Sequence, residues 1–138
     1  MLFRSPEPAQ VAAIDVSFIS LRQVLPRVRR LLVPGGDAVP LVKPQFEAGR
    51  GKVGKKGVVR DPAVWREVLE TVLAFALDTG WSVHGVIVSP IKGPAGNVEF
   101  LAHLSAGVAS RPFELDEAVE RVIGQAVRSS PGSPADLG

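Results

Sequence analysis

Three charged residues stand where their side chains could act together on one bound molecule. Asp15 lies at the end of an apolar run at 11–16, Lys43 ends a second run at 37–43, and Glu99 follows a Gly-rich turn. In open α/β sheets, ligands bind outside the carboxyl ends of the parallel strands, and an antiparallel strand begins where its parallel neighbours end. We therefore expect Asp15, Lys43 and Glu99 to converge on one edge of a sheet.

A lysine placed between carboxylates at such an edge is suited to proton transfer. In a partly desolvated site the pKa of a lysine falls toward about 7 to 8, and its neutral amine acts as a general base. Nearby carboxylates favour the charged form of an amine, so they would orient it and stabilise developing charge. The same residue types also form structural ion-pair clusters at strand ends, and taken alone they favour that second interpretation.

A basic segment between two predicted elements is the second candidate for chemistry. Residues 45–61 are predicted to form a long polar loop in which cations alternate with glycines, and its cations are Arg50, Lys52, Lys55, Lys56 and Arg60. Flexible glycines and cations suit the phosphate backbone of a nucleic acid. The glycine spacing is not that of a P-loop. A solvated loop whose charges serve solubility is the alternative.

The elements that must position these residues alternate along the chain. Apolar runs predict strands, and apolar residues at helical spacing predict helices. The predicted strands are 11–16, 37–43, 81–91 and 98–104, and the predicted helices are 21–32, 62–79 and 114–127. This order predicts an α/β fold with parallel strands and helices on both faces, to which the short link at 92–97 adds an antiparallel strand.

Local signals mark the ends of several of these elements. Ser20 and Asp61 are predicted to cap the helices that follow them, and Gly80 to end the second helix. Pro26 predicts a kink or a late start in the first helix. His84 alternates with apolar residues in a predicted strand and is interpreted as a packing histidine whose ring nitrogens are satisfied. The tryptophans Trp65 and Trp81 are also predicted to lie in the core.

The composition bounds the class of protein. The chain has 138 residues, 46% hydrophobic and 22% charged, which is the length and composition of one globular domain. It has no Cys and 2 His, which excludes a disulfide scaffold, a zinc ribbon and a thiol nucleophile, and we predict no metal site. It has no apolar run long enough to span a membrane and no visible secretion signal, so we expect a cytoplasmic protein.

Four segments in order carry a family resemblance. They are DVSFISL at 15–21, LVKPQFEAGR at 41–50, KGVVRDP at 56–62 and GPAGNVEFLAHL at 93–104. Together they resemble the carboxyl-terminal half of the hemolysin-type (TlyA) branch of FtsJ-like RNA 2′-O-ribose methyltransferases. The resemblance implies a partial Rossmann-like fold with strand order 4-5-7-6, S-adenosylmethionine as cofactor and ribosomal RNA as substrate.

The resemblance also implies roles for the charged residues. The family uses a Lys-Asp-Lys-Glu tetrad, in which Asp15, Lys43 and Glu99 match the last three members. Lys43 would accept the proton of the ribose 2′-hydroxyl while Asp15 and Glu99 position it, and Asp15 and Ser17 would contact the cofactor. The basic residues of 45–61 would bind the RNA.

The sequence lacks the earlier part of a full family member. It has no Gly-rich cofactor loop before Asp15, so we expect 11–128 to be the carboxyl-terminal part of the methyltransferase domain, between a ragged segment at 1–10 and a disordered tail at 129–138. The strand ending at Asp15 would then be an uncovered edge open to self-association.

Three functions follow from these expectations. In the first, the chain is part of a longer ribosomal RNA methyltransferase and is inactive alone. In the second, it is a non-catalytic module that binds RNA or a partner. A membrane-active hemolysin is the third, and it is the least favoured because the helices at 62–79 and 114–127 carry both acids and bases.

Overall fold

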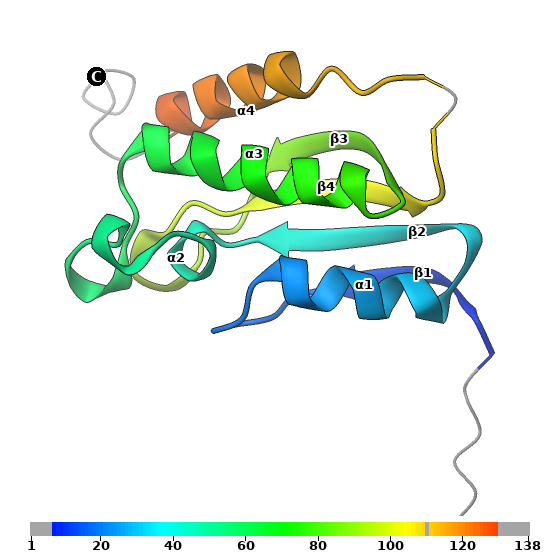
Figure 1. Ribbon diagram of the computed structural model, residues 1–138. Coiled ribbons are helices and arrows are strands. Elements are labelled where there is room, and N and C mark those ends of the chain that lie inside the picture. The colour runs from blue at the N-terminus through cyan, green and yellow to red at the C-terminus, as the bar shows by residue number, and fades with distance from the viewer. Residues whose placement is uncertain (1–6, 110, 130–138) are drawn as a thin grey trace, which may run out of the picture.

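The computed structural model describes residues 7–109 and 111–129. Its elements follow the predicted β-α-β-α-β-β-α order (Figure 1). In chain order they are β1 (Ala9–Ile14), α1 (Leu21–Leu31), β2 (Leu32–Val42), α2 (Pro44–Glu47), the 3-10 turns η1 (Arg50–Lys52) and η2 (Lys55–Gly57), α3 (Pro62–Asp78), β3 (Trp81–Val88), the 3-10 turn η3 (Pro94–Gly96), β4 (Phe100–Ala106) and α4 (Leu115–Ser129). Residues 130–138 of the predicted tail at 129–138 and residues 1–6 of the predicted ragged segment at 1–10 lie outside the described residues. Both predicted bounds were wrong by a few residues, since β1 already begins at Ala9 and Ser129 still belongs to α4.

The four strands form one mixed sheet in the order β1-β2-β4-β3. β1 runs parallel to β2, and β4 runs antiparallel to both β2 and β3. Because β4 inserts between β2 and β3, this is the predicted order 4-5-7-6, and the α/β fold class is confirmed. β1 pairs on one side only among the described strands, so it is an edge of this sheet.

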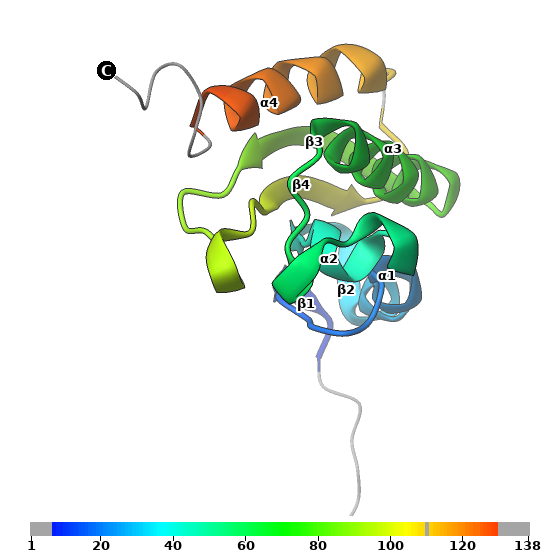
Figure 2. The same cartoon turned by 90° about the vertical axis from the view of Figure 1, so that its left-hand side faces the viewer.

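One detail of the layers differs from the prediction. α1 and α3 lie on the same side of the sheet, and α4 packs beside α3 along β3 (Figure 2). The connections β1-α1-β2 and β2-α3-β3 move in the same direction across the sheet, and right-handed crossovers then place both helices on one face. A helix would cover the second face only if its right-handed crossover moved across the sheet in the opposite direction.

Burial along the strands confirms that one face is bare in the described residues. In β4, Ala102 and Leu104 are buried while His103 between them is exposed. His84, predicted to be a satisfied packing histidine, lies exposed on the bare face at the register shift between Val83 and Gly85, and its ring centroid is 4.7 Å from that of His103. Its Nε2 lies 2.7 Å from the Oγ of Ser105.

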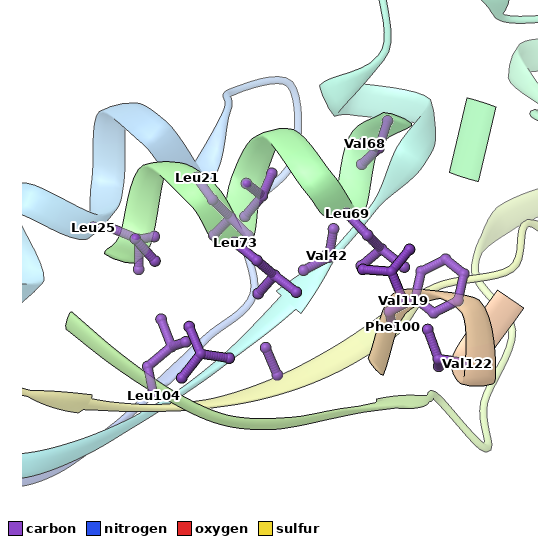
Figure 3. Close-up of a cluster of buried hydrophobic side chains, with 14 of the residues drawn as sticks. Leu21, Leu25, Val42, Val68, Leu69, Leu73, Phe100, Leu104, Val119 and Val122 are labelled. Atoms are coloured by element: carbon purple, nitrogen blue, oxygen red, sulfur yellow. The ribbon is translucent and has the colours of Figure 1, made fainter. Parts of the chain in front are cut away.

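The opposite face carries the hydrophobic core (Figure 3). Apolar residues of α3 pack onto β2 and β4, with α1 and α4 on either side; the labelled members are Leu21, Leu25, Val42, Val68, Leu69, Leu73, Phe100, Leu104, Val119 and Val122. Trp65 and Trp81 are buried as predicted. Each fully buried large side chain of this kind contributes about 1.5 to 3 kcal/mol relative to exposure.

The predicted helix boundaries are close to those of the structure. The Ser20 side chain accepts a hydrogen bond from the Arg22 N–H, and that of Asp61 accepts one from the Ala63 N–H, so both caps are confirmed. α1 begins at Leu21 and contains Pro26, so the alternative of a late helix start is wrong. None of the described helices is long and apolar enough to cross a membrane.

Candidate active site

Asp15 and Lys43 meet at one edge of the sheet. Each follows the last residue of its strand, and because β1 and β2 are parallel neighbours their side chains leave the sheet at the same end. The ammonium of Lys43 forms an ion pair with Asp15 and donates to the Oγ of Ser17 at 3.2 Å. The Lys43 side chain is 11% exposed and that of Asp15 is 68% exposed. The pair therefore joins a desolvated amine to a carboxylate that faces solvent.

Glu99 lies at the same edge but has a different partner. In the antiparallel pairing of β2 and β4, Val42 is opposite Phe100, so Lys43 and Glu99 are the next residues in register. Glu99 is 5% exposed, and its Oε2 accepts a hydrogen bond from the Nε2 of Gln45 at 2.8 Å. Asp15, Lys43 and Glu99 thus lie at one edge of the sheet, as predicted, and Gln45 donates a hydrogen bond to Glu99.

The 45–61 segment is not the loop that was predicted. It folds into α2, η1 and η2, and it is tied to the core by the buried residues Val58 and Val59. Short-range hydrogen bonds form these turns, including one from the Gly54 N–H to the Val58 carbonyl at 2.8 Å. These two buried valines were not recognised in the sequence, because the segment around them is rich in glycines and cations.

Asn97 joins this segment to the turn before Glu99. Its Oδ1 accepts from the Val59 N–H at 3.0 Å, and its Nδ2 donates to the carbonyls of Gly57 and Pro94 at 2.9 and 3.1 Å. Asn97 is 2% exposed. Sequence reasoning missed this residue, although a lone amide in a Gly-rich turn beside Glu99 was a usable signal.

The five basic candidates remain on the surface of this segment. Their side chains belong to exposed residues: Arg50, Lys52, Lys55, Lys56 and Arg60. Lys52 donates to both carboxylate oxygens of Glu67 on α3, at 2.6 Å to Oε1. Its charge is therefore partly neutralised, whereas the other four have no hydrogen bond or ion pair within the described part of the chain.

Phe18 is a further residue that sequence reasoning missed. It is 89% exposed, has φ of 65°, and its ring centroid lies 4.7 Å from that of Phe46. Its neighbours fix it, since Ser17 accepts from Lys43 and Ser20 donates to Glu47 at 2.7 Å. A large aromatic side chain in left-handed backbone beside a candidate active site is a costly arrangement that points to function.

The residues at this edge fit one end of S-adenosylmethionine. The solvent-facing Asp15 carboxylate and the Ser17 hydroxyl are suited to a cationic group of a ligand. These two side chains would hold one polar end of such a ligand.

Comparisons with known proteins agree with this geometry. The chain matches the FtsJ-like methyltransferase family over residues 2–106. The "Putative rRNA methyltransferase YqxC" of Bacillus subtilis is 49% identical over 130 residues, which cover 93% of this chain and 46% of that protein. The "16S/23S rRNA (cytidine-2'-O)-methyltransferase TlyA" of Mycobacterium tuberculosis strain H37Rv is 43% identical over 113 residues, 80% of this chain and 42% of that protein.

A solved structure gives the same result for the fold. The structure titled "Putative hemolysin from Streptococcus thermophilus" superposes with a TM-score of 0.80 at 49% identity, covering 87% of this chain and 43% of that one. The chain thus spans about half the length of the relatives that it matches. The resemblance drawn from the four sequence segments is confirmed, and the chain belongs to the FtsJ-like methyltransferase family.

Proposed function

We propose that the chain forms the catalytic part of an S-adenosylmethionine-dependent enzyme that methylates ribose 2′-hydroxyls in ribosomal RNA. The observation that carries this proposal is the buried Lys43 amine, paired with Asp15 and next in register to Glu99, at the carboxyl ends of the strands. That edge is where α/β sheets of this kind bind their ligands. The Mycobacterium tuberculosis relative is named as a 16S/23S rRNA (cytidine-2'-O)-methyltransferase, which supports the choice of ribosomal RNA.

Lys43 carries the proton-transfer step in this proposal. The 2′-hydroxyl would give its proton to Nζ of Lys43, after the ammonium seen in the ion pair with Asp15 has released a proton to solvent. The adjacent Asp15 carboxylate stabilises the ammonium that results, and the low exposure of Lys43 strengthens this attraction. When bound, S-adenosylmethionine supplies the methyl group, and Asp15 and Ser17 would contact it.

The basic segment and Phe18 supply the RNA-binding surface. Exposed cations without protein partners, chiefly Lys55, Lys56 and Arg60, are available to phosphate oxygens. The exposed ring of Phe18 is placed to stack on an unpaired base next to Lys43. RNA would therefore lie across the edge of the sheet that carries the candidate active site.

The chain alone is expected to be inactive, and two measurements test the proposal. Isothermal titration with S-adenosylmethionine tests whether the chain alone binds the cofactor. A chimera that joins the chain behind the amino-terminal part of the Bacillus subtilis relative tests whether it completes an enzyme. We expect methyl transfer to ribosomal RNA from the chimera and none from the chain, and an inactive chimera that binds the cofactor would overturn the proposal.

A non-catalytic module that binds RNA or a partner is the second candidate function. The bare sheet face and the open β1 edge favour it, because both expose strand residues such as Val11 and Ile87, which are 62% and 55% exposed. In that case the Lys43→Ala variant binds RNA as tightly as the parent chain does, and no chimera transfers a methyl group.

A further inference from the structure

We propose that Gln45 is a positioning residue that, together with Gly93, fixes the carboxylate of Glu99 for methyl transfer. This inference rests on the proposed function and adds to it a residue outside the predicted trio. It follows from three features: the partner of Glu99, the close approach of Gly93, and a buried amide oxygen that has no partner.

The first feature is the isolation of the Glu99 carboxylate from cations. Glu99 is 5% exposed, yet no ion pair to it occurs in the described part of the chain. Its Oε2 accepts from the Nε2 of Gln45 at 2.8 Å. A buried carboxylate needs hydrogen-bond donors to offset its desolvation. The Gln45 amide is therefore the side chain that determines how this carboxylate is turned.

The second feature is the contact between Glu99 and the bare backbone of Gly93. A Cβ placed on Gly93 would lie 2.2 Å from Oε2 and 2.7 Å from Cδ of Glu99, closer than any real Cβ contact. Gly93 has an ordinary φ of −76°, so backbone conformation does not require glycine here. A side chain at position 93 would instead displace the Glu99 carboxylate, which occupies the volume that the Cβ would fill.

The third feature is the other half of the Gln45 amide. Its Oε1 is buried without a hydrogen-bond partner in the described residues. A carboxylate only accepts hydrogen bonds, so Nε2 must face Glu99 and Oε1 must point away. An unsatisfied buried acceptor costs about 1 to 3 kcal/mol. A methionine would fill the same space without that cost, so packing alone does not explain glutamine at this position.

The first test is made on the chain itself. With glutamate side-chain carboxyls labelled with ¹³C, the resonance of Glu99, assigned by Glu99→Gln, is expected to shift in Gln45→Met. The matched control Gln125→Met removes an exposed amide on α4 and should leave that resonance in place. An unmoved Glu99 resonance in Gln45→Met would overturn the proposed contact.

The second test is made on the chimera with the Bacillus subtilis relative. Gln45→Met and Gly93→Ala are each expected to lower kcat at least tenfold, with KM for RNA and for S-adenosylmethionine changed less than twofold. Gly85→Ala is the control for Gly93→Ala, because a Cβ there meets nothing within 4 Å. An active chimera whose kcat is insensitive to Gln45→Met overturns this inference alone, whereas an inactive parent chimera that binds the cofactor overturns the proposed function.

A charge exchange separates positioning from mere stability. Gln45→Glu places two carboxylates together and should destabilise the fold, since like charges are then buried side by side. Combining it with Glu99→Gln restores one amide–carboxylate hydrogen bond and should recover the melting temperature. The double variant should still lack methyl transfer, because the negative charge of the carboxylate has moved from position 99 to position 45. Recovery of activity along with stability would contradict a positioning role.

Discussion

The ammonium of Lys43 pairs with the carboxylate of Asp15 across the ends of two neighbouring parallel strands. The two residues are distant in sequence, and their meeting depends on β1 and β2 being adjacent and running in the same direction. Lys43 is largely buried while Asp15 faces solvent. The pair therefore holds the nitrogen of Lys43 in a desolvated place and leaves the Asp15 carboxylate open to solvent.

Replacing Lys43 tests its role as the proton acceptor. In the chimera, Lys43→Ala is expected to lower kcat by about 10² to 10⁴-fold, the usual worth of a general base. Lys43→Arg keeps the cation beside Asp15 but cannot accept a proton, so it should be as inactive. The fold should persist, because the α2 cap is formed by the Lys43 backbone carbonyl, which accepts from Phe46 and Glu47.

The control for this prediction is Lys92→Ala, which removes an exposed lysine. Circular dichroism melts of all three variants check the fold, and single-turnover methyl transfer measures the chemistry. Undiminished turnover in Lys43→Arg would show that Lys43 acts only through its charge.

The strand order and the edge that carries the charged residues could be predicted from the sequence. Apolar runs located the strands, and the acid or lysine at the end of each run located Asp15 and Lys43. The single covered face could not be predicted in this way, because periodicity does not show in which direction a crossover moves across the sheet. The register shift at His84 was equally hidden, since alternation assumes an unbroken register.

Contacts between distant side chains account for the rest of what was missed. Nothing in the sequence distinguishes Lys52 from Lys55 as a candidate RNA-binding residue. Only the packing of η1 on α3 brings Lys52 to Glu67. Phe18 received no role of its own within DVSFISL, because a positive φ on a residue other than glycine has no signature in the sequence. Site residues at strand ends were thus predictable, and those set by turns were not.

The charges of the basic segment should dominate the salt dependence of RNA binding. In the chain, Lys55→Gln with Lys56→Gln should weaken binding and reduce the slope of log K against log salt by about 1.5, the loss of two phosphate contacts. Lys52→Gln should change the slope less, because Glu67 already neutralises that cation. Fluorescence anisotropy with a labelled ribosomal RNA stem-loop measures binding by the parent and by both variants.

The paired control for the basic segment is Lys92→Gln with Arg121→Gln, which removes the same net charge from other surfaces. An equal loss of slope in this control would indicate that net charge rather than the basic segment sets RNA affinity.

The open edge of β1 should pair with a second copy of the chain at high concentration. Val11→Lys places a charge on this exposed edge strand, which natural proteins use to prevent edge pairing. We expect the sedimentation coefficient of the parent to rise with concentration and that of Val11→Lys to stay constant. Ile91→Lys, at a 77% exposed apolar position outside the strands, should behave like the parent. A parent that remains monomeric would contradict self-association.

Asn97 should stabilise the junction between the basic segment and the turn before Glu99. Asn97→Ala removes three hydrogen bonds and leaves the buried Val59 N–H unsatisfied. We expect a loss of about 2 to 3 kcal/mol in the free energy of unfolding, measured by urea denaturation. Asn97→Asp retains the acceptor for Val59 but turns a buried carboxylate oxygen toward the carbonyls of Gly57 and Pro94, so its loss should be larger. Equal stability of Asn97→Ala and the parent would show that the junction is held by packing alone.

Phe18 should contribute to RNA methylation without contributing to stability. Its ring is exposed, so removing it costs little burial, and asparagine tolerates the left-handed backbone that phenylalanine resists. Phe18→Asn is therefore expected to change the free energy of unfolding by less than about 1 kcal/mol. It should weaken RNA binding by about 1 to 3 kcal/mol, the worth of one stacked base. Phe18→Trp restores an aromatic face and should restore binding. If Phe18→Asn binds RNA as the parent does, the exposed ring has no part in recognising the substrate, and the RNA surface is confined to the basic segment.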